Sequence, residues 1–324
     1  MKRVTILLVT ILFVGTVQAQ TLVVNSSSSD TKVLMSKNGA DGITISEYDD
    51  SELITGKYNF PPSADPSLEV YTLQNGAFIV RENIANFLMY DSFGRVQRSI
   101  SNSSQSEGGE SVSEIALDPN GKTIVLYNPK VVSGGVTGSR AQLVDDKNKA
   151  INLFYSTDRA MTLVEVSANG EFIGLASSKP GSDDEVQLMD RFGNILQTIS
   201  FDQEVKGVTF SENGLYVAIY SGSRAAAYEI RSGERVGSTS FRNTILQFAA
   251  YDPTDKTIIG VTGSGNSTLT DIELHAVNVS ARKIARKEFT ESLDVNGKIS
   301  LTRTGKGRYT ISGLSKDLSL RAGF

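Results

Sequence analysis

The residues best suited to chemistry in this chain are arginines that recur at comparable positions. The tetrapeptide Gly-Ser-Arg-Ala occurs twice, at Gly138–Ala141 and at Gly222–Ala225. Each copy lies directly before a run of residues that predicts a β-strand. Arginine binds carboxylates and phosphates through paired hydrogen bonds, so arginines gathered on one surface would form a shallow site for such groups. The candidate ligand-binding residues are Arg81, Arg140, Arg159, Arg224 and Arg242.

Other kinds of site find less support, and we predict no catalytic residue, no metal site and no cofactor. The chain has one histidine, His275, and no cysteine, whereas a zinc site needs several such ligands. No Gly-x-Ser-x-Gly elbow accompanies the histidine for a hydrolase triad. Asp183-Asp184-Glu185 lacks the spaced carboxylates of a calcium loop, so it is interpreted as a solvated acidic loop. We interpret His275 as a partly buried strand residue with a satisfied hydrogen bond.

A repeat of about 42 to 50 residues must position these side chains. Each copy has an alternating apolar run, a tight polar turn and a second apolar run. A third and a fourth strand follow. The turns fall at Ser29-Asp30, Asn75-Gly76, Asn120-Gly121, Asn169-Gly170, Asn213-Gly214, Asp255-Lys256 and Gly305-Lys306.

The clearest copy runs from Val205 to Ser240. Val208 and Phe210 alternate with polar residues, Asn213-Gly214 forms a hairpin turn, and Tyr216 to Tyr220 forms the returning strand. Two further strands, at 225–230 and 235–240, complete a sheet of four antiparallel strands. Similar copies are predicted at 68–100, 112–154, 161–199 and 245–289.

The two terminal copies are weaker, as terminal repeats usually are. The first is predicted at Thr21–Val24, Lys32–Ser36, Gly42–Tyr48 and Leu53–Tyr58, and the last at Lys298–Thr302, Tyr309–Ser312 and Leu318–Arg321. The sequence therefore predicts an all-β, seven-bladed β-propeller of four-stranded antiparallel blades, the last lacking its outer strand. Six or eight blades are the alternatives. In another version, Thr21–Val24 supplies that missing outer strand; either version closes the ring and removes exposed sheet edges.

Three segments resemble a known class of repeat. The strings SENGLYVAIY, SANGEFIGLA and DPNGKTIVLY, with the segments Tyr90–Gly94, Met189–Gly193 and Tyr228–Gly233, are similar to β-propeller repeats of the WD-repeat and YVTN type. The resemblance implies blades without implying a ligand. The chain departs from true WD repeats because it has no Trp and no His before each first strand. Propellers that bind pyrroloquinoline quinone carry Trp motifs, so that cofactor is not expected.

The first 19 residues have the pattern of a secretory signal peptide. Lys2 and Arg3 precede a mainly apolar stretch, and Val17-Gln18-Ala19 supplies a small-residue cleavage site. Its removal would change the net charge from −4 to −6, which does not favour nucleic-acid binding. We predict a signal peptide at 1–19 and one propeller domain at 20–324. An exported chain without cysteine is typical of a bacterial periplasm or cell exterior. No transmembrane segment is expected after cleavage.

In such a fold, the connections that carry the candidate arginines emerge on one face. The longest inserts there, Ile100–Ser111, Lys57–Ser67, Asn128–Ser139 and Gly263–Thr270, are predicted as surface loops suited to binding. The structural alternative is that Arg140 and Arg224 form salt bridges between blades, because repeated positions often serve the repeat itself. Both interpretations remain open at this point.

The sequence favours an exported, non-catalytic binding or scaffold propeller that recognises a protein or polysaccharide of the cell envelope through its loop-rich face. The rival hypothesis is a carbohydrate-active lyase or hydrolase with carboxylates, such as Asp158 or Glu185, at the mouth of the channel. A purely structural surface protein is the third.

Overall fold

The structure is a computed structural model. It describes residues 21–322 except for 26–31, 38–42, 49–53, 61–69, 74–76, 82–84, 92–94, 102–112, 134–135, 146, 148, 243 and 281. The predicted signal peptide, and the loop parts of the inserts at 57–67 and 100–111, lie outside these residues. Among the described residues no helix is long and apolar enough to span a membrane.

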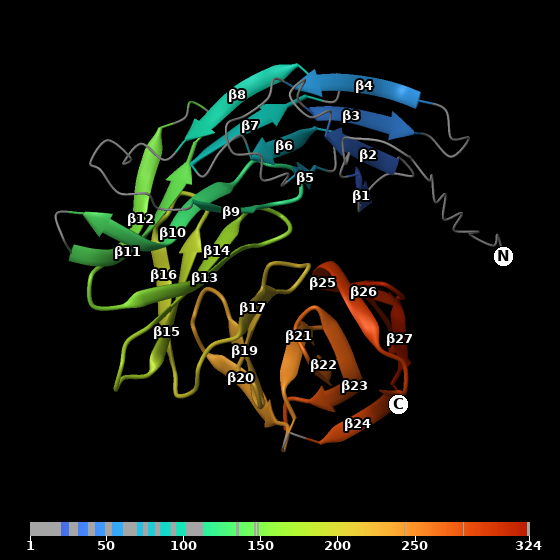
Figure 1. The fold of residues 1–324 in the computed structure, drawn as a ribbon. Coiled ribbons are helices and arrows are strands. Elements are labelled where there is room, and N and C mark those ends of the chain that lie inside the picture. The colour runs from blue at the N-terminus through green and yellow to red at the C-terminus, as the bar shows by residue number, and fades with distance from the viewer. Residues whose placement is uncertain are drawn as a thin grey trace. The chain divides into compact units, whose positions relative to one another are not determined.

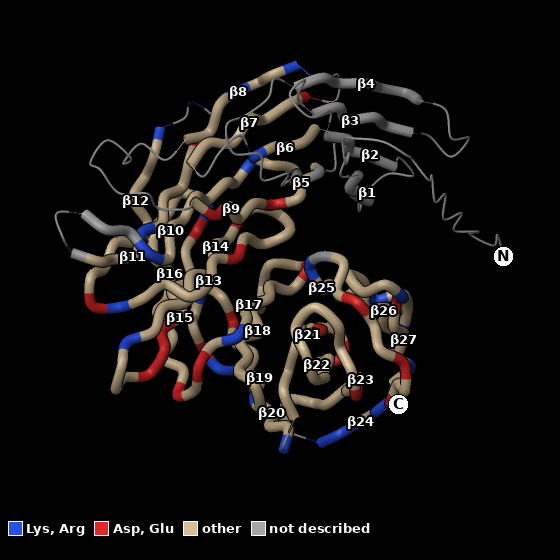
Figure 2. The backbone as a smooth tube through the Cα atoms, viewed as in Figure 1, with Lys and Arg blue, Asp and Glu red and all other residues tan. Residues whose placement is uncertain are grey.

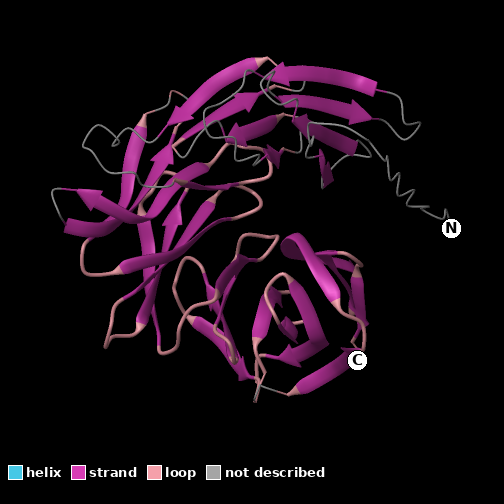
Figure 3. Cartoon of the chain, in the orientation of Figure 1, coloured by secondary structure: helices cyan, strands magenta, loops and turns pink. Residues whose placement is uncertain are grey.

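The regular elements of the described residues are β-strands, as Figure 3 shows. Five four-stranded antiparallel sheets follow one another in chain order (Figure 1). Their strands are β1 (Thr21–Asn25), β2 (Lys32–Lys37), β3 (Ile43–Tyr48) and β4 (Ile54–Phe60); β5 (Val70–Thr72), β6 (Phe78–Arg81), β7 (Asn86–Tyr90) and β8 (Val96–Ser101); β9 (Glu114–Leu117), β10 (Ile124–Ser133), β11 (Val136–Val144) and β12 (Ala150–Ser156); β13 (Ala160–Val166), β14 (Phe172–Ser178), β15 (Asp184–Asp190) and β16 (Ile195–Phe201); and β17 (Gly207–Phe210), β18 (Tyr216–Tyr220), β19 (Arg224–Glu229) and β20 (Arg235–Ser240).

The remaining strands form one seven-stranded sheet. It consists of β21 (Leu246–Asp252), β22 (Thr257–Ser264), β23 (Thr268–Asn278), β24 (Lys283–Phe289), β25 (Leu293–Gly305), β26 (Arg308–Leu314) and β27 (Leu318–Arg321). The pairs Thr268↔Asp294 and Leu269↔Leu293 join β23 to β25. This sheet therefore contains the four strands of the sixth predicted copy and the three of the seventh.

The chain divides into two compact units, which are described separately. Unit 1 comprises residues 1–83 and 89–97, and unit 2 comprises residues 84–88 and 98–324. In unit 1, β1 pairs with β2 in register Thr21↔Ser36, and the rings of Phe78 and Tyr90 stack with centroids 5.1 Å apart. The candidate residues after Arg81 all lie in unit 2.

The Asn-Gly turns are confirmed where the structure describes them. Gly121, Gly170 and Gly214 have φ values of 67°, 70° and 66°, a conformation that glycine adopts without strain. The side chain of Asn213 supports its turn by accepting hydrogen bonds from the Ser211 hydroxyl and the Leu215 amide, at 2.7 and 3.1 Å. These local bonds explain why the pattern predicted the hairpins well.

Neighbouring sheets of unit 2 pack face to face through their apolar sides. One core cluster combines Val186 and Leu188 of β15 with Val208 of β17 and Val217 of β18. Gly174 of β14 allows close approach, because a Cβ there would lie 3.0 Å from the Val208 side chain. Strand β13 contacts β9 and β10 of the preceding sheet. In the same way, β21 contacts β17 and β18 of the sheet before it. Burial of these alternating side chains is the main stabilising contribution.

Several predictions about the last copy and the inserts were wrong. Strand β25 extends over Leu293–Gly305, well beyond Lys298–Thr302, and its turn places Gly307 at φ 60°. Strand β1 pairs with β2, as the version that places Thr21–Val24 in the first copy predicts. The inserts at 128–139 and 263–270 are largely extensions of the hairpins β10–β11 and β22–β23.

Candidate functional site

Four connections lie at one end of the two sheets formed by β13–β16 and β17–β20. They are residues 157–159, 179–183, 202–206 and 221–223. Because the strands are antiparallel, the connections that enter a sheet and those between its second and third strands emerge at the same end. We call these connections, with the strand-end residues beside them, the polar rim.

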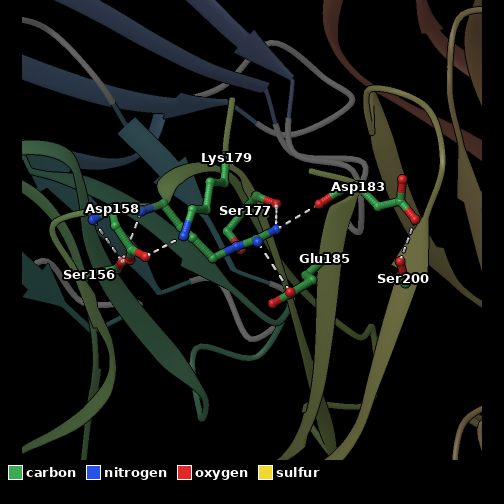
Figure 4. A network of polar contacts seen from close by, with 8 residues as sticks. Ser156, Asp158, Ser177, Lys179, Asp183, Glu185 and Ser200 are labelled. Atoms are coloured by element: carbon green, nitrogen blue, oxygen red, sulfur yellow. Dashed lines mark hydrogen bonds and ion pairs between the residues drawn. The ribbon is translucent and has the colours of Figure 1, made fainter. Parts of the chain in front are cut away.

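Arg159 is the most extensively bonded side chain of the polar rim. Its Nε donates to Ser177 Oγ at 3.1 Å, and its Nη2 donates to the carbonyl oxygens of Ser177 and Asp183 at 3.1 and 3.0 Å. Its Nη1 lies 3.1 Å from Glu185 Oε1. Figure 4 shows these partners around the guanidinium. The donors of Arg159 are therefore committed to holding two connections together.

Asp158 and Lys179 form the neighbouring ion pair. Lys179 Nζ donates to Asp158 Oδ2 at 2.9 Å, and the Ser156 hydroxyl donates to Oδ1 at 2.7 Å. The hydrogen bond from Lys179, with that from Ser156, lowers the pKa of Asp158 to about 2. Asp158 is therefore ionised at neutral pH, which makes it a poor general acid.

The acidic segment 183–185 is only partly the solvated loop that was predicted. Asp183 is exposed and accepts a hydrogen bond from the Ser200 hydroxyl at 2.9 Å. Asp184, by contrast, is buried and accepts one from the Val205 amide at 2.8 Å. Its carboxylate secures the connection that follows β16, because a buried acceptor requires a donor. Among the described residues no group of three or more His, Asp or Glu could hold a metal ion.

Arg224 joins the connection between two sheets to the fifth sheet. It pairs with Asp202 through both terminal nitrogens, with Nη1 2.9 Å from Oδ2. Its guanidinium also lies 4.4 Å from the ring centroid of Phe201. The hydrogen bond from Arg224 lowers the pKa of Asp202. For Arg224 the structural interpretation, a salt bridge linking neighbouring blades, is confirmed.

The other candidate arginines differ in their surroundings. Arg242 is exposed and follows Phe241, whose amide donates to the Ser223 carbonyl at 2.6 Å, so it adjoins the polar rim. Arg140 does not precede its strand as predicted. It lies within β11, half-buried and opposite Tyr155. Arg81 ends β6 in unit 1 and is buried. Unit 2 thus places Arg140, Arg159, Arg224 and Arg242 in or beside connections at the same end of their sheets; their role in ligand binding stays a prediction.

His275 is more deeply buried than predicted. It lies on a strand as predicted, β23, with 2% of its surface exposed. Its Nε2 is 2.9 Å from Glu273 Oε2, and Phe241 contacts its ring edge to face. Burial lowers the pKa of His275, so the neutral ring is favoured at pH 7. This environment is that of a core residue.

One carboxyl group, that of Glu165 on β13, has a raised pKa, in contrast to Asp158 and Asp202. Burial raises the pKa of Glu165 on β13, and its side chain pairs with Lys298 of β25. This contact was not predicted from the sequence, because the two residues are far apart in the chain and each has the pattern of an ordinary surface charge. A raised pKa is one property of a general acid, but hydrolysis of a glycoside requires a second carboxyl group beside it.

No family model and no curated protein matches the chain. Among solved structures, the chain is similar to the Dos1 propeller, with 13% identity, a TM-score of 0.56, and coverage of 90% of this chain and 75% of that one. It is also similar to the β-propeller domain of Cps50 (Swd1) from Myceliophteria thermophila, with 9% identity, a TM-score of 0.53, and coverage of 93% and 99%.

These likenesses define the fold. The chain is an all-β protein with the β-propeller fold, built from four-stranded antiparallel sheets. Seven blades fit the five separate sheets together with the two copies joined in the last one. Propellers in general serve as binding or scaffold structures, and their particular ligands depend on residues grafted onto the blades.

Proposed function

We propose that this chain is an exported, non-catalytic propeller that binds a protein or polysaccharide of the cell envelope through the polar rim and the adjoining residues. In this proposal residues 1–19 are removed as a signal peptide. Residues 20–324 form one propeller domain in a bacterial periplasm or outside the cell. The proposal is supported by the propeller fold and by the composition of the rim.

The observation that carries the proposal is that the polar rim is rigidified by its own ion pairs. Arg159, Lys179 and Arg224 each have a carboxylate partner within the rim. A surface whose side chains are already held in place loses less conformational entropy when a partner binds. Tyr155 borders this surface with 56% of its area exposed, and tyrosine and arginine are typical of recognition surfaces.

The polar rim offers little to support the hydrolase or lyase alternative. Asp158 has a lowered pKa, whereas a general acid at neutral pH needs a raised one. The carboxylate of Glu185 is paired with Arg159. Both carboxylates named as catalytic candidates are therefore explained by their contacts within the rim.

Capture from a cell-envelope extract tests the proposal. The tagged mature chain is compared with a Tyr155→Ala/Arg242→Gln variant. The control variant is Arg231→Gln, at an exposed position outside the polar rim. We expect one envelope protein or glycan to bind the wild type and the control, and to bind the rim variant at least about tenfold less. Equal capture by all three chains, or turnover of a polysaccharide by the pure protein, would contradict the proposal.

Export is tested separately by cell fractionation and by N-terminal sequencing of the mature protein. The expected result is a periplasmic or secreted chain that begins at Gln20. A cytoplasmic chain that begins at Met1 would remove the proposed compartment and with it the class of partner.

A further inference from the structure

A surface groove of about 430 Å³ lies in unit 2 between β24 and the strands β26 and β27. It is distant in sequence from the polar rim, and none of the five candidate arginines lines it. Four basic residues line it: Arg286, Lys287, Arg308 and Arg321. We call it the basic groove, and Figure 2 shows the run of Lys and Arg along β24 that forms one of its sides.

The register of the last hairpin places two like charges directly opposite each other. Arg308 pairs with Arg321, and Thr310 pairs with Ser319, so these four residues share one face of the sheet. Tyr309 and Leu320 alternate with them and are buried. Like charges directly opposite on neighbouring strands are destabilising. Among the described residues neither Arg308 nor Arg321 forms an ion pair, so no direct carboxylate partner offsets their repulsion.

The other charges that face the groove leave it positive. Arg286 is neutralised by Glu273 and Glu288, with Nε 3.2 Å from Glu273 Oε2 and Nη2 2.7 Å from Glu288 Oε1. Lys287 donates to the Ser319 carbonyl at 3.3 Å and lies over the ring of Phe289. Lys287 therefore keeps its charge unpaired beside the two arginines. This excess is local, because the whole chain carries a net charge of −4.

We propose that the basic groove is a binding site for the oxyanion of an acidic ligand, a carboxylate or a phosphate. Arg308 and Arg321 bind the anion from two neighbouring strands. Guanidinium groups form parallel hydrogen bonds with such oxygens. The hydroxyls of Thr310 and Ser319 line the same groove and supply further donors. Binding would replace the repulsion between the two arginines with attraction to a shared anion. The site is separate from the polar rim and does not depend on the proposed function.

Isothermal titration of the full mature chain with inorganic phosphate and with citrate tests this inference, at an ionic strength held constant with sodium chloride. The variant is Arg308→Gln/Arg321→Gln. The matched control is Arg231→Gln/Arg235→Gln, which removes the same charge from exposed positions on another sheet. Circular dichroism and the unfolding midpoint confirm that each variant is folded.

We expect the wild type and the control to bind at least one of the two anions. We expect the groove variant to bind that anion at least about tenfold more weakly. Tighter binding of phosphate, or of citrate, identifies which oxyanion the site prefers. The inference is overturned if the wild type binds neither anion at about 10 mM, or if the folded groove variant binds as tightly as the wild type. An equal loss in the control would also overturn it, since the effect would then be one of net charge alone.

Discussion

The polar rim and the basic groove both present arginines at the surface of unit 2, but they differ in how those arginines are balanced. In the rim, Arg159 and Arg224 have carboxylate partners supplied by nearby connections. In the groove, Arg308 and Arg321 face each other across two strands and have no ion pair among the described residues. The first arrangement stabilises a shape, whereas the second leaves charge available to a ligand.

A third arrangement of an arginine lies on the opposite face of this sheet from Arg308 and Arg321. Arg303 of β25 contacts two carboxylates, with Nε 3.1 Å from Asp252 Oδ2 and Nη2 3.2 Å from Asp255 Oδ2. The buried Tyr309 hydroxyl also donates to Asp255, at 2.9 Å. Burial and this hydrogen bond raise the pKa of Tyr309. The three regions thus form a series, from buried and paired to exposed and unpaired.

The largest effect is expected at this buried cluster. Asp255→Ala removes the acceptor of Tyr309 and one partner of Arg303, and it leaves a buried hydroxyl unsatisfied. We expect the free energy of unfolding in urea to fall by about 3 kcal/mol. Tyr309→Phe removes only the hydroxyl, so its loss should be smaller, about 1 kcal/mol. Equal losses in the two variants would show that the carboxylate contributes nothing beyond that one bond.

A smaller loss is expected at Arg159. Its side chain is 14% exposed and joins its own connection to the connection 179–183 and the strand ends beside it. Arg159→Leu should lower the free energy of unfolding by about 2 kcal/mol, since several acceptors lose their donor together. Arg159→Lys should restore only part of this loss, because one ammonium cannot reach all four oxygens. Full restoration by lysine would mean that charge alone, and not the forked geometry, matters here.

Arg224→Ala should cost about 1 kcal/mol or less. The pair with Asp202 is on the surface, where solvent screens it, although the contact with Phe201 adds to it. Chemical denaturation at low and at high salt separates the two contributions. The ionic part should fade at high salt, while the packing on Phe201 should persist. A loss as large as that of Arg159→Leu would be evidence against this ranking.

The ion pair of Asp158 and Lys179 should affect the stability of the fold mainly at acidic pH. Since the folded pKa of Asp158, about 2, lies below its ordinary value of 3.8, the pair contributes stability above pH 3.8 that is lost as the pH falls towards 2. Lys179→Met removes the main cause of the shift. Carboxyl titration by NMR should then show the Asp158 pKa rising towards 3.8. An unchanged pKa would assign the shift to Ser156 instead.

The smallest effect on stability is expected in the basic groove. Arg308→Gln and Arg321→Gln should each change the free energy of unfolding by about 0.5 kcal/mol or less, and the sign should be stabilising because a like-charge repulsion is relieved. Urea denaturation in dilute chloride buffer measures this. A loss of more than about 1 kcal/mol in either variant would show that these arginines have a structural partner.

The sequence predicted local structure well where a short pattern determines it. Asn213-Gly214 makes a turn through its own side-chain and backbone bonds, so five consecutive residues were enough. Strand β24, Lys283–Phe289, likewise lies within the copy predicted at 245–289. Longer hairpins were missed at Asn128–Ser139, because Ser and Gly suggested a loop. The pairs Val131↔Gly138 and Val132↔Thr137 show that the backbones continue to bond.

The candidate site was predictable only in part, because its meaning depends on partners distant in the chain. The positions of Arg159 and Arg224 near the ends of strands followed from the repeat, but their acceptors Asp183 and Asp202 belong to other connections. Arg308 and Arg321 were missed altogether. They are thirteen positions apart, and their juxtaposition depends on the register of β26 and β27. That register follows from the burial of Tyr309 and Leu320, which sequence alone did not specify.

The difference between paired and unpaired arginines is tested most directly by unfolding the protein with and without the anion that binds more tightly, inorganic phosphate or citrate, at constant ionic strength. A ligand that binds only the folded state raises the free energy of unfolding in proportion to the logarithm of its concentration. We predict that this anion stabilises the wild type and the Arg224→Gln variant equally, and that it leaves the stability of Arg308→Gln/Arg321→Gln unchanged. Equal stabilisation of all three proteins, or of none, would contradict the account.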